Sequence, residues 1–356
     1  MNSRRGKMEF GIFMQFERRE GGTQADAFQE GFSLIDAAEA WGIDEAWLSE
    51  VHFAPTRTVL SSPAVIAGSI ATRTERLRVG TAVSVLPLGN PLRIAEEMAT
   101  VDQIAEGRFD FGIGRSAFPR AYDVYGIPYQ ESRGRFEEAL EIILEAWKGE
   151  PFSYNGEYFR IESAHISPTP YTLPHPPLRV AATTEETFPR MGQQGMPIFV
   201  GLRGMDVNDL RVNLAKYREA WNDAGHPGEG DVSLRIPIYA GDTEQAALDE
   251  PSESIHAYFS RMSSLYRDSA GQAGTEATEL RQGRGERLAK MTFENMLETK
   301  VAFGSAEGLV GRLSRLEEDL GLNSVIAELN PGGLIPPDRV MHSMEILAKD
   351  VAPHFK

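Results

Sequence analysis

Segments with the spacing of buried strands alternate with segments that have the spacing of amphipathic helices along most of the chain. The first strand is expected at residues 8–14, and the helix expected at 25–40 carries Phe28, Phe32, Ile35 and Ala38 three or four residues apart. Further strands are expected at residues 44–48, 77–85, 107–116, 178–182, 197–200, 232–240 and 325–329. About eight strand–helix units predict a single parallel (β/α)8 barrel over residues 1–356. An open doubly wound sheet normally carries a glycine-rich dinucleotide motif after its first strand, and residues 14–24 contain none.

Two stretches interrupt the alternation. Residues 151–177 contain Tyr154, Gly156, Tyr158 and several prolines, which predicts a hairpin and loop outside the barrel. Residues 242–300 are long, polar and uneven, and we interpret them as a mobile lid; a disordered insertion is the alternative. The lid contains an amphipathic run that favours either core packing or an apolar substrate cavity, with Ile255, His256, Tyr258, Phe259, Met262 and Tyr266.

The overall composition excludes several kinds of protein. The chain has 36 basic and 52 acidic residues, a net charge of −16, which argues against a nucleic-acid or anionic-membrane partner. No run approaches the roughly 18 apolar residues of a membrane span, and the N-terminal residues do not have the pattern of a signal peptide. Cysteine is absent, which excludes disulfides and cysteine zinc sites, and no metal site is expected. A cytoplasmic protein is predicted.

The stretch 107–116 ends in Gly-Ile-Gly-Arg-Ser. Phe109, Phe111 and Ile113 alternate as in a strand, and Gly114 leaves no side chain between the backbone and a ligand. Arg115 then stands where the strand ends, which in a barrel is the edge that holds the active site. Since a guanidinium can fork onto a phosphate, we interpret the stretch as the floor and anion anchor of a cofactor site. The alternative is an ordinary core strand followed by a solvated arginine.

Several motifs occur together in one order along the chain: Glu50-Val51-His52-Phe53, residues 79–83, residues 91–102, residues 107–115, Ser132-Arg133 and residues 180–187. In this set the chain resembles the bacterial-luciferase-like flavin-dependent monooxygenases over nearly its whole length. The resemblance implies a TIM barrel that binds FMN at the carboxyl ends of its strands.

By this resemblance, Arg115, Arg133, Thr184 and Thr187 match phosphate-binding positions, and the backbone near Ala117 matches a flavin contact. Thr183 falls where the luciferase large subunit has a glutamate. Threonine hydroxyls and cationic forks are suitable phosphate donors, although Thr183 and Thr184 would serve equally well as helix caps.

The resemblance also places Ala82 and Val83 at a non-prolyl cis peptide bond beneath the isoalloxazine ring, where sequence alone favours a trans strand. Gly114 replaces a reactive cysteine of the luciferase, which predicts open space over the ring. Phe13 and Glu328, at the ends of the first and last strands, are expected to line the substrate pocket.

Val51 is the main departure from the family pattern. Light-emitting members have two adjacent histidines here, and the first is assigned to proton transfer, whereas this chain keeps only His52. Valine cannot move a proton, so His52 is either an alternative base or a structural support. Glu50, two residues away, would face the same side of an extended segment and orient His52. Val51 itself is expected to line the substrate pocket.

The resemblance therefore implies a two-component monooxygenase. Reduced FMN from a separate flavin reductase would react with O2 to give a C4a-peroxyflavin, which oxygenates a small, largely apolar organic substrate. A homodimer formed by helices near residues 62–105 is also implied. The alternatives are a deazaflavin- or flavin-dependent oxidoreductase without oxygen insertion, a non-catalytic flavin-binding protein, and a sugar or aldol-type barrel enzyme without flavin.

Overall fold

Eight parallel strands close into a barrel in this computed structural model, which describes residues 7–116, 119–271 and 275–356. The strands of the barrel wall are β1 (Glu9–Met14), β2 (Glu45–Leu48), β3 (Arg78–Thr81), β5 (Phe109–Gly114), β8 (Leu178–Ala181), β9 (Ile198–Gly201), β10 (Val232–Ala240) and β12 (Ser324–Glu328). Each pairs with the next, and β12 pairs with β1 to complete the ring. The predicted (β/α)8 barrel is confirmed.

The helices that surround the barrel are α1 (Gln24–Trp41), α2 (Pro63–Arg73), α3 (Pro91–Ala105), α5 (Ser132–Ala146), α6 (Thr187–Gln193), α7 (Val207–Asp223), α12 (Ala306–Leu320) and α13 (Pro337–Ile346). Several begin at side chains that satisfy free backbone N–H groups, as Thr23 does for α1 and Asp206 for α7. Short elements complete the chain: β4 (Ser84–Val85), α4 (Arg120–Tyr125), β11 (Ala302–Gly304) and the helical turns at Leu86–Leu88, Tyr129–Glu131, Leu347–Val351 and Ala352–Phe355.

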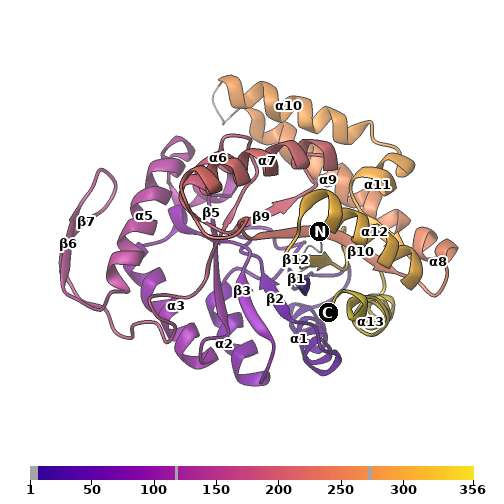
Figure 1. Ribbon diagram of the computed structural model, residues 1–356, viewed down its shortest axis with the longest axis horizontal. Helices are drawn as coiled ribbons and strands as arrows, with labels where there is room; N and C mark the ends of the chain where they lie inside the picture. The colour runs from indigo at the N-terminus through magenta and orange to yellow at the C-terminus, as the bar shows by residue number, and fades with distance from the viewer. Residues whose placement is uncertain (1–6, 117–118, 272–274) are drawn as a thin grey trace.

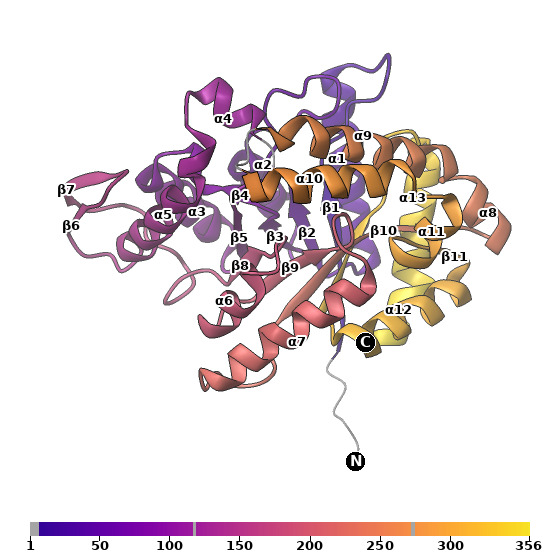
Figure 2. The ribbon, with the colours of Figure 1, turned by 90° about the horizontal axis from the view of Figure 1, so that it is seen from above.

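The stretch 151–177 contains an antiparallel hairpin of β6 (Phe152–Asn155) and β7 (Arg160–Ala164), which projects beside α5 (Figure 1). The stretch 242–300 forms the helices α8 (Glu244–Asp249), α9 (Ser252–Ala270), α10 (Thr275–Ala289) and α11 (Phe293–Thr299). In Figure 2, α4, α9 and α10 lie toward the end of the barrel opposite the C terminus, which is the end where the parallel strands finish. The insertion therefore borders the edge of the barrel that holds sites in this fold.

The strand predicted at residues 77–85 is not continuous. It divides into β3 and β4 at the Ala82–Val83 peptide bond, which is cis, as the resemblance predicts. β3 pairs with β2 and β5, whereas β4 pairs only with β5 among the described strands.

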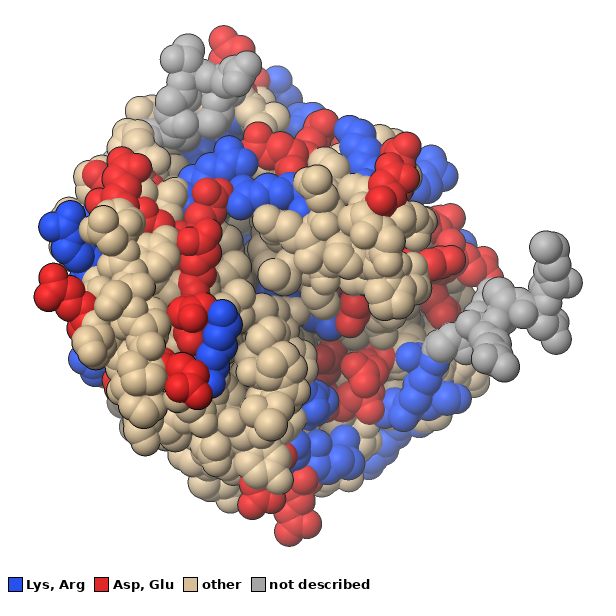
Figure 3. Space-filling view, turned by 60° about the vertical axis from the view of Figure 1, so that its left-hand side comes forward, with Lys and Arg blue, Asp and Glu red and all other residues tan. Residues whose placement is uncertain are grey.

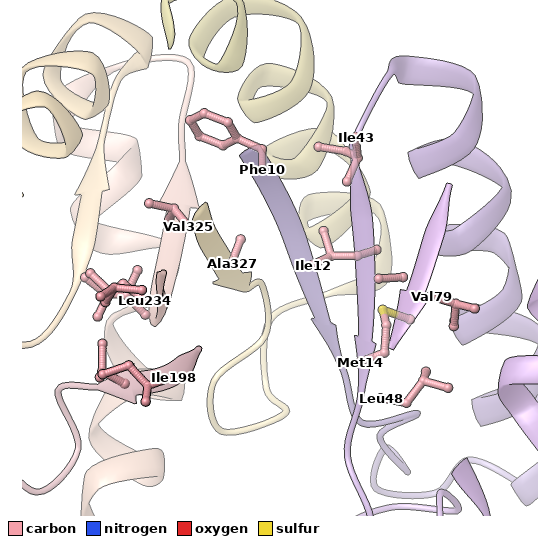
Figure 4. Packing of buried hydrophobic residues seen from close by; sticks show 14 of the residues in the cluster. Phe10, Ile12, Met14, Ile43, Leu48, Val79, Ile198, Leu234, Val325 and Ala327 are labelled. Carbon is pink, nitrogen blue, oxygen red and sulfur yellow. The ribbon is translucent and has the colours of Figure 1, made fainter. Parts of the chain in front are cut away.

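Alternate residues of each strand face the helices or the barrel interior. The outward set, which includes Phe10, Ile12 and Met14, packs into the main hydrophobic core between strands and helices (Figure 4). The inward set forms a smaller cluster of Phe13, Trp47, Phe199 and Ile326, with Ala82 and Val83 against it. Large inward rings are accommodated because a neighbouring position is glycine: a Cβ on Gly80 would lie 2.3 Å from the Trp47 ring.

Candidate functional site at the barrel mouth

The side chains predicted to bind a phosphate come together where β5 and β8 end. Arg115 follows β5, and its guanidinium lies 3.5 Å from the Ser132 hydroxyl at the start of α5. Arg133, the next residue, reaches across to Glu186 at 4.0 Å. Segments that are distant in the sequence thus meet at one place. Ala117, the expected backbone contact, lies outside the described residues.

The threonines after β8 bond to each other instead of capping α6. The hydroxyls of Thr184 and Thr187 are 2.9 Å apart, and the N-cap position of α6 is Glu186, whose side chain makes no capping bond. The Thr183 carbonyl accepts from Arg284 of α10 at 3.4 Å. The Thr184 and Thr187 hydroxyls therefore do not cap α6, and they remain available to bind a ligand.

The floor of the mouth is apolar. Ala82 and Val83 pack against Phe13, Trp47 and Phe199, whose rings fill the top of the barrel interior. The expectation of open space at Gly114 is wrong: a Cβ there would lie 2.6 Å from Cγ2 of Val83, so the Val83 side chain fills that space.

Glu50 and His52 are in contact, as their spacing predicts. The distance from Glu50 Oε1 to His52 Nε2 is 2.8 Å, and Glu50 Oε2 accepts from the Val85 N–H at 2.9 Å. Glu50 therefore links the histidine to the segment that follows the cis bond. Val51 is half-buried, and its N–H donates to the Leu60 carbonyl.

Tyr125, on α4, completes this arrangement. Its hydroxyl lies 3.3 Å from His52 Nδ1, so both ring nitrogens of the histidine have a polar partner. Glu50, His52 and Tyr125 line an open groove that continues between α2 and α3. A histidine held at both nitrogens has a fixed orientation and can accept or donate a proton there.

Glu328, at the end of β12, is only 2% exposed and is surrounded by donors. Arg235 of β10 forms an ion pair with it at 2.7 Å, and Gln15 and Tyr258 donate to its two oxygens at 3.1 and 3.2 Å. Burial alone would raise the pKa of this carboxyl, but Arg235, Arg203 and Arg57 outweigh it and hold the pKa below its usual value. Glu328 is therefore a carboxylate at neutral pH.

Phe13 lies within the same group. The Arg235 guanidinium lies 3.2 Å from the centroid of its ring, a cation–π contact. The predicted pocket residues Phe13 and Glu328 are thus joined through Arg235. Met14, Gln15, Glu328 and Asn330 line a small crevice on the α1 side of these strands.

The amphipathic run of the insertion is mainly core. Ile255, Tyr258, Phe259 and Met262 of α9 pack with residues of α10 and α11 in a cluster separate from the barrel core. Only the Tyr258 hydroxyl among these four reaches the mouth, through Glu328. This favours the core interpretation of the run over an apolar cavity.

Sequence reasoning missed Tyr125, Arg57, Arg235 and the arginines of α10. Arg235 could have been identified from the sequence, because it interrupts an otherwise apolar strand at an inward-facing position. No sequence feature marks Tyr125 or Arg284 as a site residue, since each reaches the mouth from a segment whose place in the fold depends on tertiary packing.

The described residues show no metal-binding group, no membrane-spanning helix and, on the face in Figure 3, no continuous basic surface. Within the described ranges, no group of three or more candidate side chains is placed to hold a metal ion. None of the described helices is long and apolar enough to cross a membrane. The face in Figure 3 shows acidic and basic side chains interspersed, without the continuous basic surface that nucleic acid requires.

Comparison with known proteins identifies the family to which the chain belongs. The sequence model of the luciferase-like monooxygenases matches residues 8–324. The oxygenase component of flavin-dependent trigonelline monooxygenase from Acinetobacter baylyi is 26% identical, over 98% of this chain and 96% of that protein. The uncharacterized protein y4wF of Sinorhizobium fredii is 34% identical, but over only 51% of this chain and 52% of its own length. The predicted class, flavin-dependent monooxygenase, is confirmed at the level of the family.

Solved structures with the same fold include one in complex with FMN and one of an enzyme that depends on coenzyme F420. The oxygenating constituent of 3,6-diketocamphane monooxygenase from Pseudomonas putida, solved with FMN, superposes with a TM-score of 0.80 at 22% identity, covering 97% of this chain and 98% of that one. The coenzyme F420-dependent tetrahydromethanopterin reductase of Methanopyrus kandleri gives 0.75 at 20% identity, covering 99% and 100%. These likenesses establish the fold.

Proposed function

Since the chain belongs to the luciferase-like monooxygenase family, we propose that it is the oxygenase of a two-component, FMN-dependent system in the cytoplasm. A separate flavin reductase supplies reduced FMN, and the enzyme uses it with O2 to oxygenate a small organic substrate. The observation that carries the proposal is the convergence of Arg115, Ser132, Arg133 and the Thr184–Thr187 pair at the ends of β5 and β8.

The residues present fit an FMN phosphate. Arg115 and Arg133 supply guanidinium groups that bind phosphate oxygens, and the paired threonine hydroxyls supply neutral donors. Arg133 is 52% exposed, so its guanidinium remains accessible. Its carboxylate neighbours are Glu137 at 3.4 Å and Glu186 at 4.0 Å, and a bound phosphate would replace Glu186 as a partner of Arg133.

The remaining residues have distinct proposed roles. Ala82 and Val83, with the rings beneath them, form an apolar floor for the flavin ring. Reduced FMN, when bound, supplies the electrons that activate O2. His52 is the proposed proton-transfer group, and Glu50 is the residue that positions it. The helices of the 242–300 insertion act as the lid that keeps water away from the reaction.

Replacement of a residue proposed to bind the FMN phosphate tests the location of the phosphate site. Arg115→Ala should weaken FMN binding by about tenfold or more, because a hydrogen bond to a charged group contributes about 1.5–3 kcal/mol. Arg120→Ala is the matched control, since Arg120 is exposed on the neighbouring α4. Quenching of FMN fluorescence measures both. Equal affinity of Arg115→Ala and the parent protein would refute the phosphate site.

A second experiment separates the candidate chemistries. The protein is loaded with chemically reduced FMN and mixed rapidly with oxygenated buffer. A transient absorbance change that outlives the signal of free FMN supports the oxygenase. FMN binding without this transient favours a non-catalytic binder. A deazaflavin oxidoreductase, which the F420-dependent structural relative makes the second candidate, would instead prefer coenzyme F420 over FMN in the binding assay.

We also propose a homodimer through α2 and α3. Val65 on α2 and Ile104 on α3 are 65% and 44% exposed, although both are large apolar side chains. Sedimentation of the parent protein and of Val65→Asp tests this: the variant should sediment as a monomer if this face joins the subunits.

A further inference from the structure

We propose that the substrate carries a carboxylate and that a group of arginines at the barrel mouth binds it. The proposal deepens the proposed function and rests on it, since it names the substrate class of the same site. It differs from the largely apolar substrate expected from the sequence.

Four arginines from separate segments come together at the mouth, three of them around Glu328 and the fourth beside Arg57. They are Arg57 in the loop before α2, Arg203 after β9, Arg235 on β10 and Arg261 on α9. All four are half-buried. We refer to them as the arginine cluster.

The contacts of the cluster fix its position. Arg57 donates to Gln15, whose amide in turn donates to Glu328 Oε1 at 3.1 Å. Arg203 interacts electrostatically with Tyr258, whose hydroxyl donates to the other Glu328 oxygen at 3.2 Å. A single carboxylate therefore lies at the centre of a ring of donors.

The positive charge of the cluster exceeds the negative charge near it. Glu328 compensates one guanidinium. Glu17, a second nearby carboxyl group, is mainly neutral at pH 7, because burial and the charge of Glu328 raise its pKa to about 8. Glu30 is already paired with Arg19 at 2.7 Å. Among the described residues, the cluster thus has more guanidinium groups than ionised carboxylates beside it, in a chain of net charge −16.

The arginines also repel one another. Burial, followed by the charge of Arg261, lowers the pKa of Arg57 to about 10. Burial and the charge of Arg203 lower the pKa of Arg235. With a pKa of about 10, Arg57 remains protonated at neutral pH. Keeping partly desolvated like charges together is unfavourable unless an anion joins them.

One donor of the cluster has neither a hydrogen bond nor an ion pair among the described residues. The buried Nε of Arg261 makes no hydrogen bond within the described part of the chain. A planar carboxylate matches the fork of a guanidinium and would complete this donor set. The contact of Arg235 with the Phe13 ring holds one guanidinium flat at the edge of the apolar floor. A substrate with a carboxylate and an apolar body fits both surfaces.

Benzoate and benzamide test the charge requirement, because they share a ring and differ in charge. Calorimetric titration of the protein at low ionic strength should show benzoate binding at least tenfold more tightly than benzamide. High salt should weaken the binding of benzoate only. Equal affinities, or no binding of benzoate, would overturn the proposal.

Variants locate the site. Arg57→Gln and Arg261→Gln should each weaken benzoate binding by about tenfold or more and leave benzamide unchanged. Arg315→Gln, exposed on α12, is the control and should have no effect. Glu328→Gln should strengthen benzoate binding, because it removes the carboxylate that competes for the cluster. Unchanged benzoate binding in both cluster variants would overturn the proposal, provided that their thermal midpoints show folded protein.

FMN titration of the same samples keeps the two proposals distinguishable. The calorimetry needs no flavin, so discrimination between benzoate and benzamide supports the carboxylate site whether or not FMN binds. Failure of FMN binding alone would contradict the proposed cofactor. Failure of benzoate discrimination with intact FMN binding would contradict only the carboxylate site.

Discussion

At the level of single residues, Glu50 connects two parts of the mouth. One oxygen contacts His52, and the other accepts from the backbone of Val85, just beyond the Ala82–Val83 bond. The contact with His52 could be predicted, because residues two apart in an extended segment face the same side. The bond to Val85 could not, since it depends on how β2 and β3 lie beside each other.

Replacement of Glu50 should separate its structural role from its charge. Glu50→Ala leaves the Val85 N–H without its acceptor and should lower the free energy of unfolding by about 1–3 kcal/mol. Glu50→Gln keeps an oxygen of the same reach and should cost less than about 1 kcal/mol. Chemical denaturation monitored by tryptophan fluorescence measures both. Equal losses in the two variants would show that the charge, and not the backbone contact, matters for stability.

Glycine substitutions test how tightly the barrel interior is packed. A Cβ on Gly112 of β5 would lie 1.8 Å from the Thr81 carbonyl oxygen, so Gly112→Ala should destabilise the protein by about 1–3 kcal/mol or more. Gly68, inside α2, has its nearest such neighbour 4.0 Å away. Gly68→Ala should therefore stabilise by about 0.5–1 kcal/mol through helix propensity. Thermal unfolding should move the two midpoints in opposite directions; a shift in the same direction would contradict this account.

At the level of elements, the strands and flanking helices of the barrel could be predicted because burial sets a clear periodicity. The short elements could not. β11 has three residues, too few to show a period, and β4 depends on the break at Ala82–Val83. α12 is not among the elements expected from the sequence, although it has a clear helical stripe of Leu309, Leu313, Leu316 and Leu320. The four helices of the insertion are mixed in polarity because much of their surface faces solvent.

The contacts of α10 couple the insertion to the proposed phosphate site. Arg284 donates to the Thr183 carbonyl, and Arg281 donates to the Tyr129 hydroxyl at 2.7 Å, close to the start of α5. FMN that holds these two segments in place should slow the local opening that trypsin needs, so cleavage after Arg281 and Arg284 should slow severalfold. Cleavage after Arg160 in the exposed hairpin is the internal control and should not change. Equal rates at Arg284 with and without FMN would argue against this coupling.

At the level of the whole molecule, charge is arranged in layers along the barrel axis. The arginine cluster lies at the mouth, while the lower interior contains Arg78 paired with Asp110 at 2.8 Å and Arg179 paired with Asp231 at 2.7 Å. Glu45, near both pairs, is 4% exposed, and its Oε1 makes no hydrogen bond to the described residues. Composition alone could not indicate this arrangement, because alternation places a residue inside the barrel only once the register of every strand is known.

Glu45 should make stability depend on pH. Burial raises the pKa of its carboxyl from 4.5 to about 8 in the folded protein. Between these values the unfolded chain releases the proton and the folded chain keeps it, so the free energy of unfolding falls as pH rises through this window. Glu45→Gln removes one such group and should make the fall between pH 5 and 7.5 shallower, by up to about 1.4 kcal/mol per pH unit. Glu17, whose pKa is also raised to about 8, should keep a smaller slope of the same sign in the variant. Glu328 has a lowered pKa, so its contribution to stability is lost only at lower pH and does not mask the effect of Glu45.

Urea denaturation at a series of pH values gives the slopes, with Glu162→Gln, exposed on β7, as the control. Identical slopes in Glu45→Gln and the parent protein would mean that Glu45 is already ionised inside the barrel, held by Arg179.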